Sequence, residues 1–205
     1  MIFALVIMIM WTIQPYNVYQ QLVKEGYFYC DPNQSENLQY SDFRLAYRWM
    51  IKQLKAKAGQ PCNQVTTPLW AWYRSHDYRH QRPDFRWCKT YPDEVCIEFD
   101  IPEEKVLLSD FEGWHFVLNN WYYSSATSDE EWERDEKWFA SLSKQKQQPV
   151  KEKSWQRIFD ITPRYGEWTR NGDAVQGCFW LLQMNQVRKV WRLKKGERVH
   201  EIYSV

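Results

Sequence analysis

The sequence predicts a single α+β domain, in which a mixed or antiparallel split sheet is flanked by helices and ends in a C-terminal antiparallel meander. Apolar side chains alternate from Glu94 to Ile101, which is typical of a strand with one buried face. Apolar residues recur at helical spacing between Ser41 and Gly59, and the turn dipeptide Asn171-Gly172 separates short strand-like runs. The 205 residues fit one domain, residues 1–205, with a charged helical segment at about 128–160.

The apolar segment from Met1 to Trp11 leads into a predicted strand around Ile9–Gln14. Pro15 then suits the first turn of a helix that ends at Gly26. No basic residue precedes the apolar run, and the run is shorter than the roughly 20 residues that span a bilayer. We therefore expect a buried first strand, with no signal peptide and no membrane partner.

Helix starts in the second half of the chain are predicted from short spacings of polar residues. Ser109 with Glu112, and Ser128 with Glu131, match the capping box, in which a hydroxyl and a carboxylate satisfy the first N–H groups of a helix. Pro149 suits the start of a further helix, so the polar stretch just before it is expected to be exposed.

Composition excludes several classes of protein. The 27 basic and 26 acidic side chains give a net charge of +1, so we expect no duplex nucleic acid as a partner. Five cysteines without a C-x-x-C pair favour free thiols and a cytoplasmic location over a disulfide framework or a zinc ribbon. The sequence lacks the motifs of phosphate-loop hydrolases, dinucleotide Rossmann enzymes, serine hydrolases and zincins. With 13 Trp and 13 Tyr the chain is tryptophan-rich, which favours an aromatic core with some of the rings lining a groove.

Cations and aromatic rings alternate between Trp70 and Tyr91. Guanidinium groups bind phosphate through paired hydrogen bonds while aromatic faces stack on bases, so this composition favours a nucleotide-like anionic ligand in an aromatic and basic cleft. An adenine nucleotide or dinucleotide is the expected ligand class. The residues predicted to bind it are Arg74, Arg82 and Arg86 on phosphate, and Trp70 or Trp72 on the base.

The same segment has a purely structural explanation. Its arginines can stack on neighbouring rings and pair with Asp77, Asp84 and Asp93 across a solvated loop. His76 and His80 are four residues apart, but without helical periodicity or a third nearby ligand they do not predict a metal site. Both explanations of the arginines stay open at the level of sequence.

His115 and one group of carboxylates are the remaining candidates for chemistry. His115 lies on the apolar stripe of its predicted helix, which fits a hydrogen-bonded core histidine or a catalytic side chain. Glu94, Glu98 and Asp100 share the polar face of one predicted strand, where they suit an acid–base pair but arise equally from simple alternation. These patterns alone assign no catalytic residue.

Four motifs carry a resemblance to a family: Trp11–Gln14, Pro68–Tyr73, Ser109–Phe111 with Trp114-His115, and Trp155 with Ile158–Asp160. At these positions the chain resembles the bacterial and phage domain-of-unknown-function family 3841, over nearly its whole length. The resemblance implies membership of the family and leaves the mechanism open. His76 and His80 do not belong to the family's pattern.

A second resemblance concerns architecture. A first strand followed by a helix that ends in Gly, and a terminal antiparallel hairpin, resemble the split-sheet ADP-ribosyltransferase fold, in which a polar residue on the first strand and a late glutamate flank bound NAD. The counterparts by position are Gln14 or Thr12, and Gln176. The Gln176 amide lacks the carboxylate charge that steadies an oxocarbenium-like transition state, so the resemblance implies binding of NAD without efficient transfer.

Three functions follow as alternatives. The preferred one is a binding domain for a nucleotide-like ligand. The second is an ADP-ribosyltransferase-like enzyme that acts on NAD, with Gln14, His115 and Gln176 as the candidate catalytic residues. The third is a protein-interaction module in phage–host conflict, which uses exposed Trp and Arg side chains as hot spots.

Overall fold

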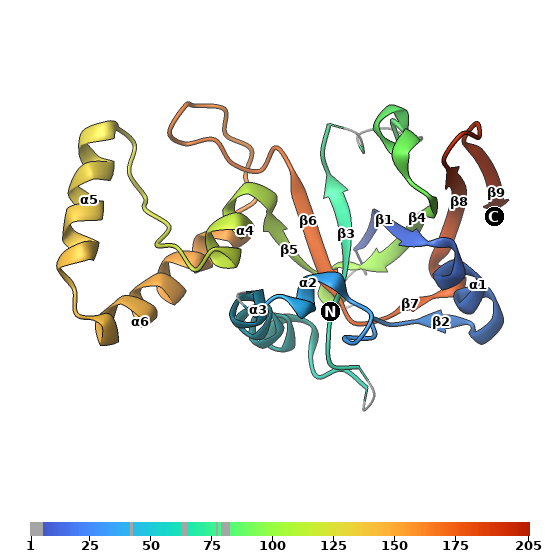
Figure 1. Cartoon of the computed structure of the whole chain (residues 1–205), viewed down its shortest axis with the longest axis horizontal. Helices are drawn as coiled ribbons and strands as arrows, with labels where there is room; N and C mark the ends of the chain where they lie inside the picture. The colour runs from blue at the N-terminus through green and yellow to red at the C-terminus, as the bar shows by residue number, and fades with distance from the viewer. Residues whose placement is uncertain (1–5, 42, 63–64, 77, 79–82) are drawn as a thin grey trace.

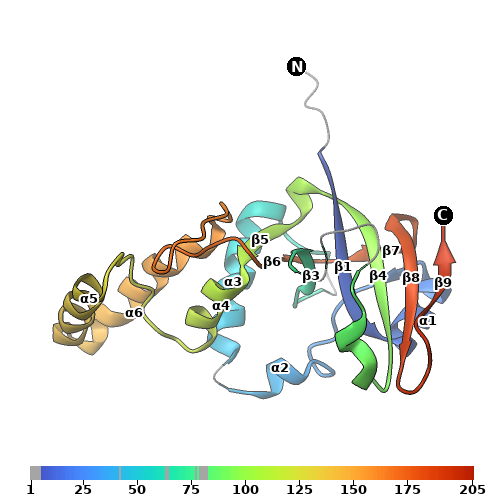
Figure 2. The ribbon, with the colours of Figure 1, turned by 90° about the horizontal axis from the view of Figure 1, so that it is seen from above.

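A computed structural model describes residues 6–41, 43–62, 65–76, 78 and 83–205. In this part of the chain, seven strands form one antiparallel sheet in the order β5-β6-β3-β1-β4-β8-β9 (Figures 1 and 2). Two short strands, β2 and β7, form a separate antiparallel pair. The strands are β1 (Ile7–Pro15), β2 (Tyr27–Phe28), β3 (Leu69–Arg74), β4 (Asp93–Pro102), β5 (Leu107–Asp110), β6 (Val175–Phe179), β7 (Leu182–Gln183), β8 (Val187–Lys194) and β9 (His200–Ser204).

Helices occupy the connections between these strands. The α-helices are α1 (Tyr16–Glu25), α2 (Glu36–Gln39), α3 (Phe43–Ala58), α4 (Phe111–Leu118), α5 (Asp129–Ser141) and α6 (Lys144–Ser154). Single 3₁₀ turns lie at η1 (Arg86–Thr90), η2 (Glu103–Lys105), η3 (Trp155–Phe159) and η4 (Met184–Gln186). Among the residues described, no helix is both long enough and apolar enough to cross a membrane.

One face of the sheet is covered by α1 and the β2–β7 pair. Side chains alternate between the two faces of a strand, and β1 pairs with β4 along its whole length. Met10, Ile97 and Phe99 therefore point to the same face, where they are completely buried together with Leu22 of α1. This cluster is the larger apolar core of the fold.

The opposite face is covered in two parts. Over β5, β6 and β3, the helices α3 and α4 and the turn η3 pack around Trp155 and Cys178. Over β1, β4 and β8, Tyr78 and Phe85 pack with Trp191. Because the two apolar clusters meet at β3, the side chains of that strand lie at the border between them.

The structure confirms the predicted α+β fold and its mostly antiparallel sheet. Gly26 and Gly59 end α1 and α3 in the left-handed conformation, in which a residue without Cβ is favoured. The C-terminal strands are antiparallel, but only β8 and β9 are neighbours, because β6 inserts between β5 and β3. The five cysteines are free thiols.

Two predicted helix starts were wrong. Asp110, and not Ser109, caps α4, because Ser109 is still paired in β5 and points into the core. The helix expected to begin at Pro149 begins at Lys144 and contains Pro149 in its interior. Proline removes the hydrogen bond to the carbonyl of Gln145, and the cost is small here because that residue is exposed and water can replace the bond.

Candidate functional site

A hollow of about 330 Å³ opens beside the middle of β3. In the described parts of β1 and β3 a single pair, Trp11 and Trp72, is in register, so the two strands are joined over a short distance only. The hollow lies where they separate, and β6 forms its other side. Its lining residues are Trp11, Thr12, Ile13, Trp70, Ala71, Trp72, Tyr91 and Gln176.

The indole rings of the hollow are held by packing on their outer sides. Trp70 lies 5.1 Å from the ring centroid of Trp114 on α4. Trp72 lies 5.0 Å from the Phe111 ring and stacks at 6.1 Å on Tyr78. Both indoles remain partly exposed. Aromatic rings that are fixed in this way lose little freedom on binding a flat ligand.

Three polar atoms on this face are buried and have no hydrogen-bond partner among the residues described. They are the Gln176 amide nitrogen Nε2, the Trp70 indole nitrogen Nε1 and the Ser109 hydroxyl. Gln176 is only 8% exposed, and its backbone is paired with that of Trp72 on one side and Ser109 on the other. Buried polar groups are normally hydrogen-bonded, so these atoms are suited to a ligand or ordered water.

Thr12 and Gln14 are joined to each other beside the hollow. The Thr12 hydroxyl donates to the carbonyl of Trp70 at 2.8 Å and accepts from the Gln14 amide at 2.9 Å. The single proton of this hydroxyl is therefore used in the hydrogen bond that joins β1 to β3. Of the residues predicted from sequence, Thr12, Trp70, Trp72 and Gln176 line one hollow, and Gln14 adjoins it.

The carboxylate of Glu98 holds the Trp11 side of the hollow. It accepts a hydrogen bond from the Trp11 indole at 2.9 Å and from Arg188 at 3.2 Å, and it is 4% exposed. Arg188 also binds Asp100 at 3.1 Å. Because Glu98 and Asp100 share the guanidinium of Arg188, the structure favours an ion-pair network for these two carboxylates over the acid–base pair that the sequence left open.

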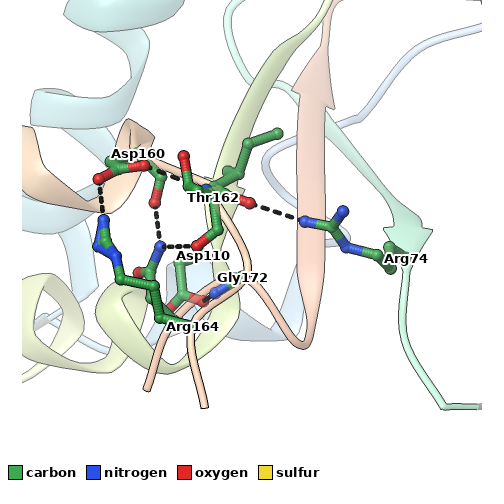
Figure 3. Close-up of polar contacts among 8 residues, drawn as sticks. Arg74, Asp110, Asp160, Thr162, Arg164 and Gly172 are labelled. Carbon is green, nitrogen blue, oxygen red and sulfur yellow. Dashed lines mark hydrogen bonds and ion pairs between the residues drawn. The ribbon is translucent and has the colours of Figure 1, made fainter. Parts of the chain in front are cut away.

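Of the three predicted arginines, the two that the structure describes, Arg74 and Arg86, do not line the hollow. Arg74 donates through Nη2 to the carbonyl of Ile161 at 2.7 Å, as Figure 3 shows, and its buried Nε has no hydrogen-bond partner in the described part of the chain. Arg86 is exposed and paired with Asp84, whose pKa its hydrogen bonds lower to about 2. Arg82 lies outside the described residues, as does His80.

A second polar cluster, which was not predicted from the sequence, holds residues 160–172, the segment whose Ile161 carbonyl binds Arg74 (Figure 3). The buried Asp110 carboxylate accepts from the backbone N–H of Gly113 and of Gly172. The Asn171 amide donates to the carbonyls of Asp160 and Thr162. An Asp between a strand and a helix and an Asn-Gly pair were the available signals, but nothing in the sequence joins them.

The comparisons with known proteins agree with the tryptophan-rich motifs. The sequence pattern of the domain of unknown function DUF3841 matches residues 9–188. The chain belongs to this family. Every residue that lines the hollow falls within the matched range of the DUF3841 domain. No curated protein and no solved structure matches the chain, so the likeness to ADP-ribosyltransferases receives no support from either comparison.

His115 of the DUF3841 domain is not a core histidine. Its side chain is 45% exposed, it meets the Phe111 ring edge-on at 4.7 Å, and it does not line the hollow. The nearest acid, Glu112, is 3.9 Å away, beyond hydrogen-bond length. Among the described His, Cys, Asp and Glu residues, no group of three is placed to hold a metal ion.

The hollow of the DUF3841 domain is uncharged at neutral pH. None of its lining residues is acidic or basic. Burial raises the pKa of its one phenol, Tyr91, to about 12, and the nearby thiol of Cys88 and carboxylate of Glu94 add to the shift. The arrangement therefore suits a neutral, flat group that accepts hydrogen bonds.

Proposed function

We propose that this DUF3841 domain binds the planar base of a nucleotide-like small molecule, an adenine nucleotide or NAD, in the hollow between β1, β3 and β6. A volume of about 330 Å³ is at the lower end of ligand pockets and suits one heteroaromatic ring system. The observation that carries the proposal is the pair of buried donors, the Gln176 amide and the Trp70 indole, that lack partners beside aromatic rings.

Hydrogen-bond chemistry selects the ligand class. Both unpartnered nitrogen atoms are donors, and the edge of a purine presents ring nitrogens that accept. The indoles of Trp70 and Trp72 supply faces on which a base stacks, worth about 1–3 kcal/mol per base in single-stranded nucleic-acid sites. We therefore expect recognition to depend on the base more than on the phosphates.

The arginines support a smaller role for phosphate than the sequence suggests. Arg86 is neutralised by Asp84, and Arg74 is occupied by the Ile161 carbonyl through one of its nitrogens. A phosphate that binds strongly needs a guanidinium free to make paired hydrogen bonds. We expect adenosine and adenosine monophosphate to bind with similar affinity.

Isothermal titration calorimetry with adenine, adenosine, adenosine monophosphate and NAD tests the proposal. We expect Gln176→Leu and Trp70→Phe each to weaken binding about tenfold or more, because each removes one buried donor, worth about 1.4 kcal/mol. The matched controls are Gln60→Leu and Trp168→Phe, at exposed positions that do not line the hollow. A folded protein that binds none of the four compounds contradicts the proposal, and so do equal affinities in all variants.

The same compounds separate binding from catalysis. Transfer of ADP-ribose from NAD passes through a cation-like transition state that a carboxylate stabilises, and no lining residue of the hollow is acidic. We expect NAD to be recovered intact after incubation with the protein. Consumption of NAD that disappears in Gln14→Ala and Gln176→Ala would replace binding with the enzymatic alternative.

A further inference from the structure

The helices α5 and α6 form an arm that extends past β5, the edge strand of the sheet (Figures 1 and 2). No residue of either helix is buried. A helix normally buries one apolar stripe, because tertiary packing supplies most of its stability. The arm is therefore a pair of helices whose expected packing partner is not provided by the described part of the chain.

Few contacts hold α5 to the segment before it. The Tyr122 ring stacks on Phe139 at 4.9 Å and meets Trp138 at 5.9 Å, and the Ser124 hydroxyl donates to Asp135 at 2.6 Å. These contacts cover one side of α5 only.

Large aromatic side chains remain in solvent on the arm. Trp132 and Trp138 of α5 are 46% and 47% exposed, and Trp121 just before the arm is 58% exposed. Exposed tryptophans gathered on one element are typical of a protein interface, in which Trp is enriched at the energetic centre.

The two helices carry opposite charges. Helix α5 has six acidic and two basic side chains, a net charge of −4, whereas α6 has four lysines and one glutamate, a net charge of +3. Among the described residues, none of the α6 lysines forms an ion pair, and neither do Asp129, Glu130 and Glu136 of α5. The two helices diverge from their junction (Figure 1), so they do not neutralise each other along their length.

We propose that the arm is a self-association surface, on which a second copy of this chain binds. In a two-fold symmetric dimer, α5 of each copy lies against α6 of the other, and both contacts form at once. Each contact joins a helix of charge −4 to one of +3, with Trp132 and Trp138 covered at the centre. Charge complementarity in an isologous arrangement favours a second copy over an unrelated partner, because one surface supplies both halves of the match.

The mass of the full chain in solution tests this directly. By sedimentation equilibrium at low ionic strength we expect a species of about twice the 25.1 kDa chain, and weaker association as salt is added. A protein that stays monomeric at about 100 μM in low salt, on the scale where weak dimers form, overturns the proposal.

Charge reversal gives the sharper test. Lys146→Glu with Lys153→Glu changes the net charge of α6 from +3 to −1, and Glu130→Lys with Glu133→Lys changes that of α5 from −4 to 0; all four positions are exposed. We expect each double variant alone to associate at least about tenfold more weakly, since α6 of the first repels α5, and α5 of the second no longer attracts α6. An equimolar mixture of the two is expected to restore a dimer, because the unchanged α5 of one copy, with a charge of −4, then meets the unchanged α6 of the other, with a charge of +3.

The control is Lys52→Glu with Lys55→Glu on α3, which changes the net charge by the same amount and sign as the α6 variant, at exposed positions outside the arm. Circular dichroism checks that the helices stay folded. If the α5 variant unfolds, the proposal is tested by comparing the association of the α6 variant with that of the α3 control. Dimers that survive reversal of α6, or a mixture that stays monomeric although both variants are folded, contradict the proposal.

Discussion

The carboxylate of Asp110 accepts a hydrogen bond from the backbone N–H of Gly172, 62 residues later in the chain, at 2.8 Å. Its other oxygen accepts from the N–H of Gly113 at 2.7 Å, and the side chain is 3% exposed. One carboxylate thus caps α4 and fixes the segment that leads into β6. We predict that Asp110→Ala destabilises the fold by about 3 kcal/mol, since it removes a helix cap and leaves a buried N–H without an acceptor.

Urea unfolding followed by circular dichroism measures this loss. Glu112→Gln in the same helix is the control, because the Glu112 side chain is 78% exposed and its replacement is expected to change stability by less than about 0.5 kcal/mol. If both variants unfold at the same urea concentration, Asp110 does not hold the two segments together.

The sequence indicates Gly172 only as a turn residue, but the structure makes it a steric requirement. Its φ is +66°, and a Cβ there would lie 2.4 Å from the carbonyl oxygen of Ile161. Gly196 has a φ of +81° with nothing within 4 Å. Gly172→Ala and Gly196→Ala therefore share the backbone cost of about 1–2 kcal/mol, and only the first adds a clash with backbone.

We expect Gly172→Ala to lower the melting temperature clearly more than Gly196→Ala does. If both variants lower the melting temperature equally, the backbone around Ile161 moves away from the new Cβ at residue 172 without an energetic cost. The comparison needs no knowledge of the unfolded state, because the two variants replace the same residue type with the same side chain.

Much of the fold follows from local patterns. The alternation from Glu94 to Ile101 gave β4 and its buried face, and the helical spacing before Gly59 gave α3. Periodicity succeeds for these two elements because each side chain is sorted by the two faces of its own element. The alternation of cations and rings also pointed to Trp70 and Trp72, and the ADP-ribosyltransferase resemblance pointed to Gln176; all three line one hollow in the structure.

The remainder depends on pairing between distant segments. Ser109 and Asp110 both suit a helix cap, and only the register of β5 on β6 turns Ser109 into the sheet face and frees Asp110 for α4. In the same way, Arg74 stands in an aromatic and basic run, but a carbonyl 87 residues later takes its guanidinium. No local rule predicts such distant partners, so the sequence alone does not show that Arg74 is bound to this carbonyl.

The unpartnered amide of Gln176 has a consequence for stability as well as for binding. A buried donor without an acceptor costs about 1–3 kcal/mol, so we predict that Gln176→Leu leaves the protein as stable as before or more stable, although it weakens ligand binding. Gln186→Leu is the contrast, because that side chain accepts from Gln183 N at 2.8 Å and donates to the Asp100 carbonyl at 3.1 Å.

Chemical unfolding of the two variants without ligand decides the point. We expect Gln186→Leu to lose about 2 kcal/mol, because it removes two hydrogen bonds that each contribute about 1 kcal/mol, and Gln176→Leu to lose none. A larger loss in Gln176→Leu than in Gln186→Leu would show that the Gln176 amide serves the fold and is not reserved for a ligand.

The phenol of Tyr91 makes the hollow sensitive to alkaline pH. Burial raises its pKa to about 12 in the folded protein, against about 10 in an unfolded chain. Between these values the unfolded chain has lost a proton that the folded protein still holds, so stability is complete below about pH 10 and falls as pH rises toward 12. Tyr91→Phe removes this group, and we predict a shallower fall in urea midpoint between pH 10 and 12 than in the wild type.

Tyr165→Phe, at a side chain that is 79% exposed, is expected to keep the wild-type slope. Because the buried thiols titrate in all three proteins, only the difference between slopes reports on Tyr91, and identical slopes for Tyr91→Phe and the wild type would contradict a buried, neutral phenol in the hollow.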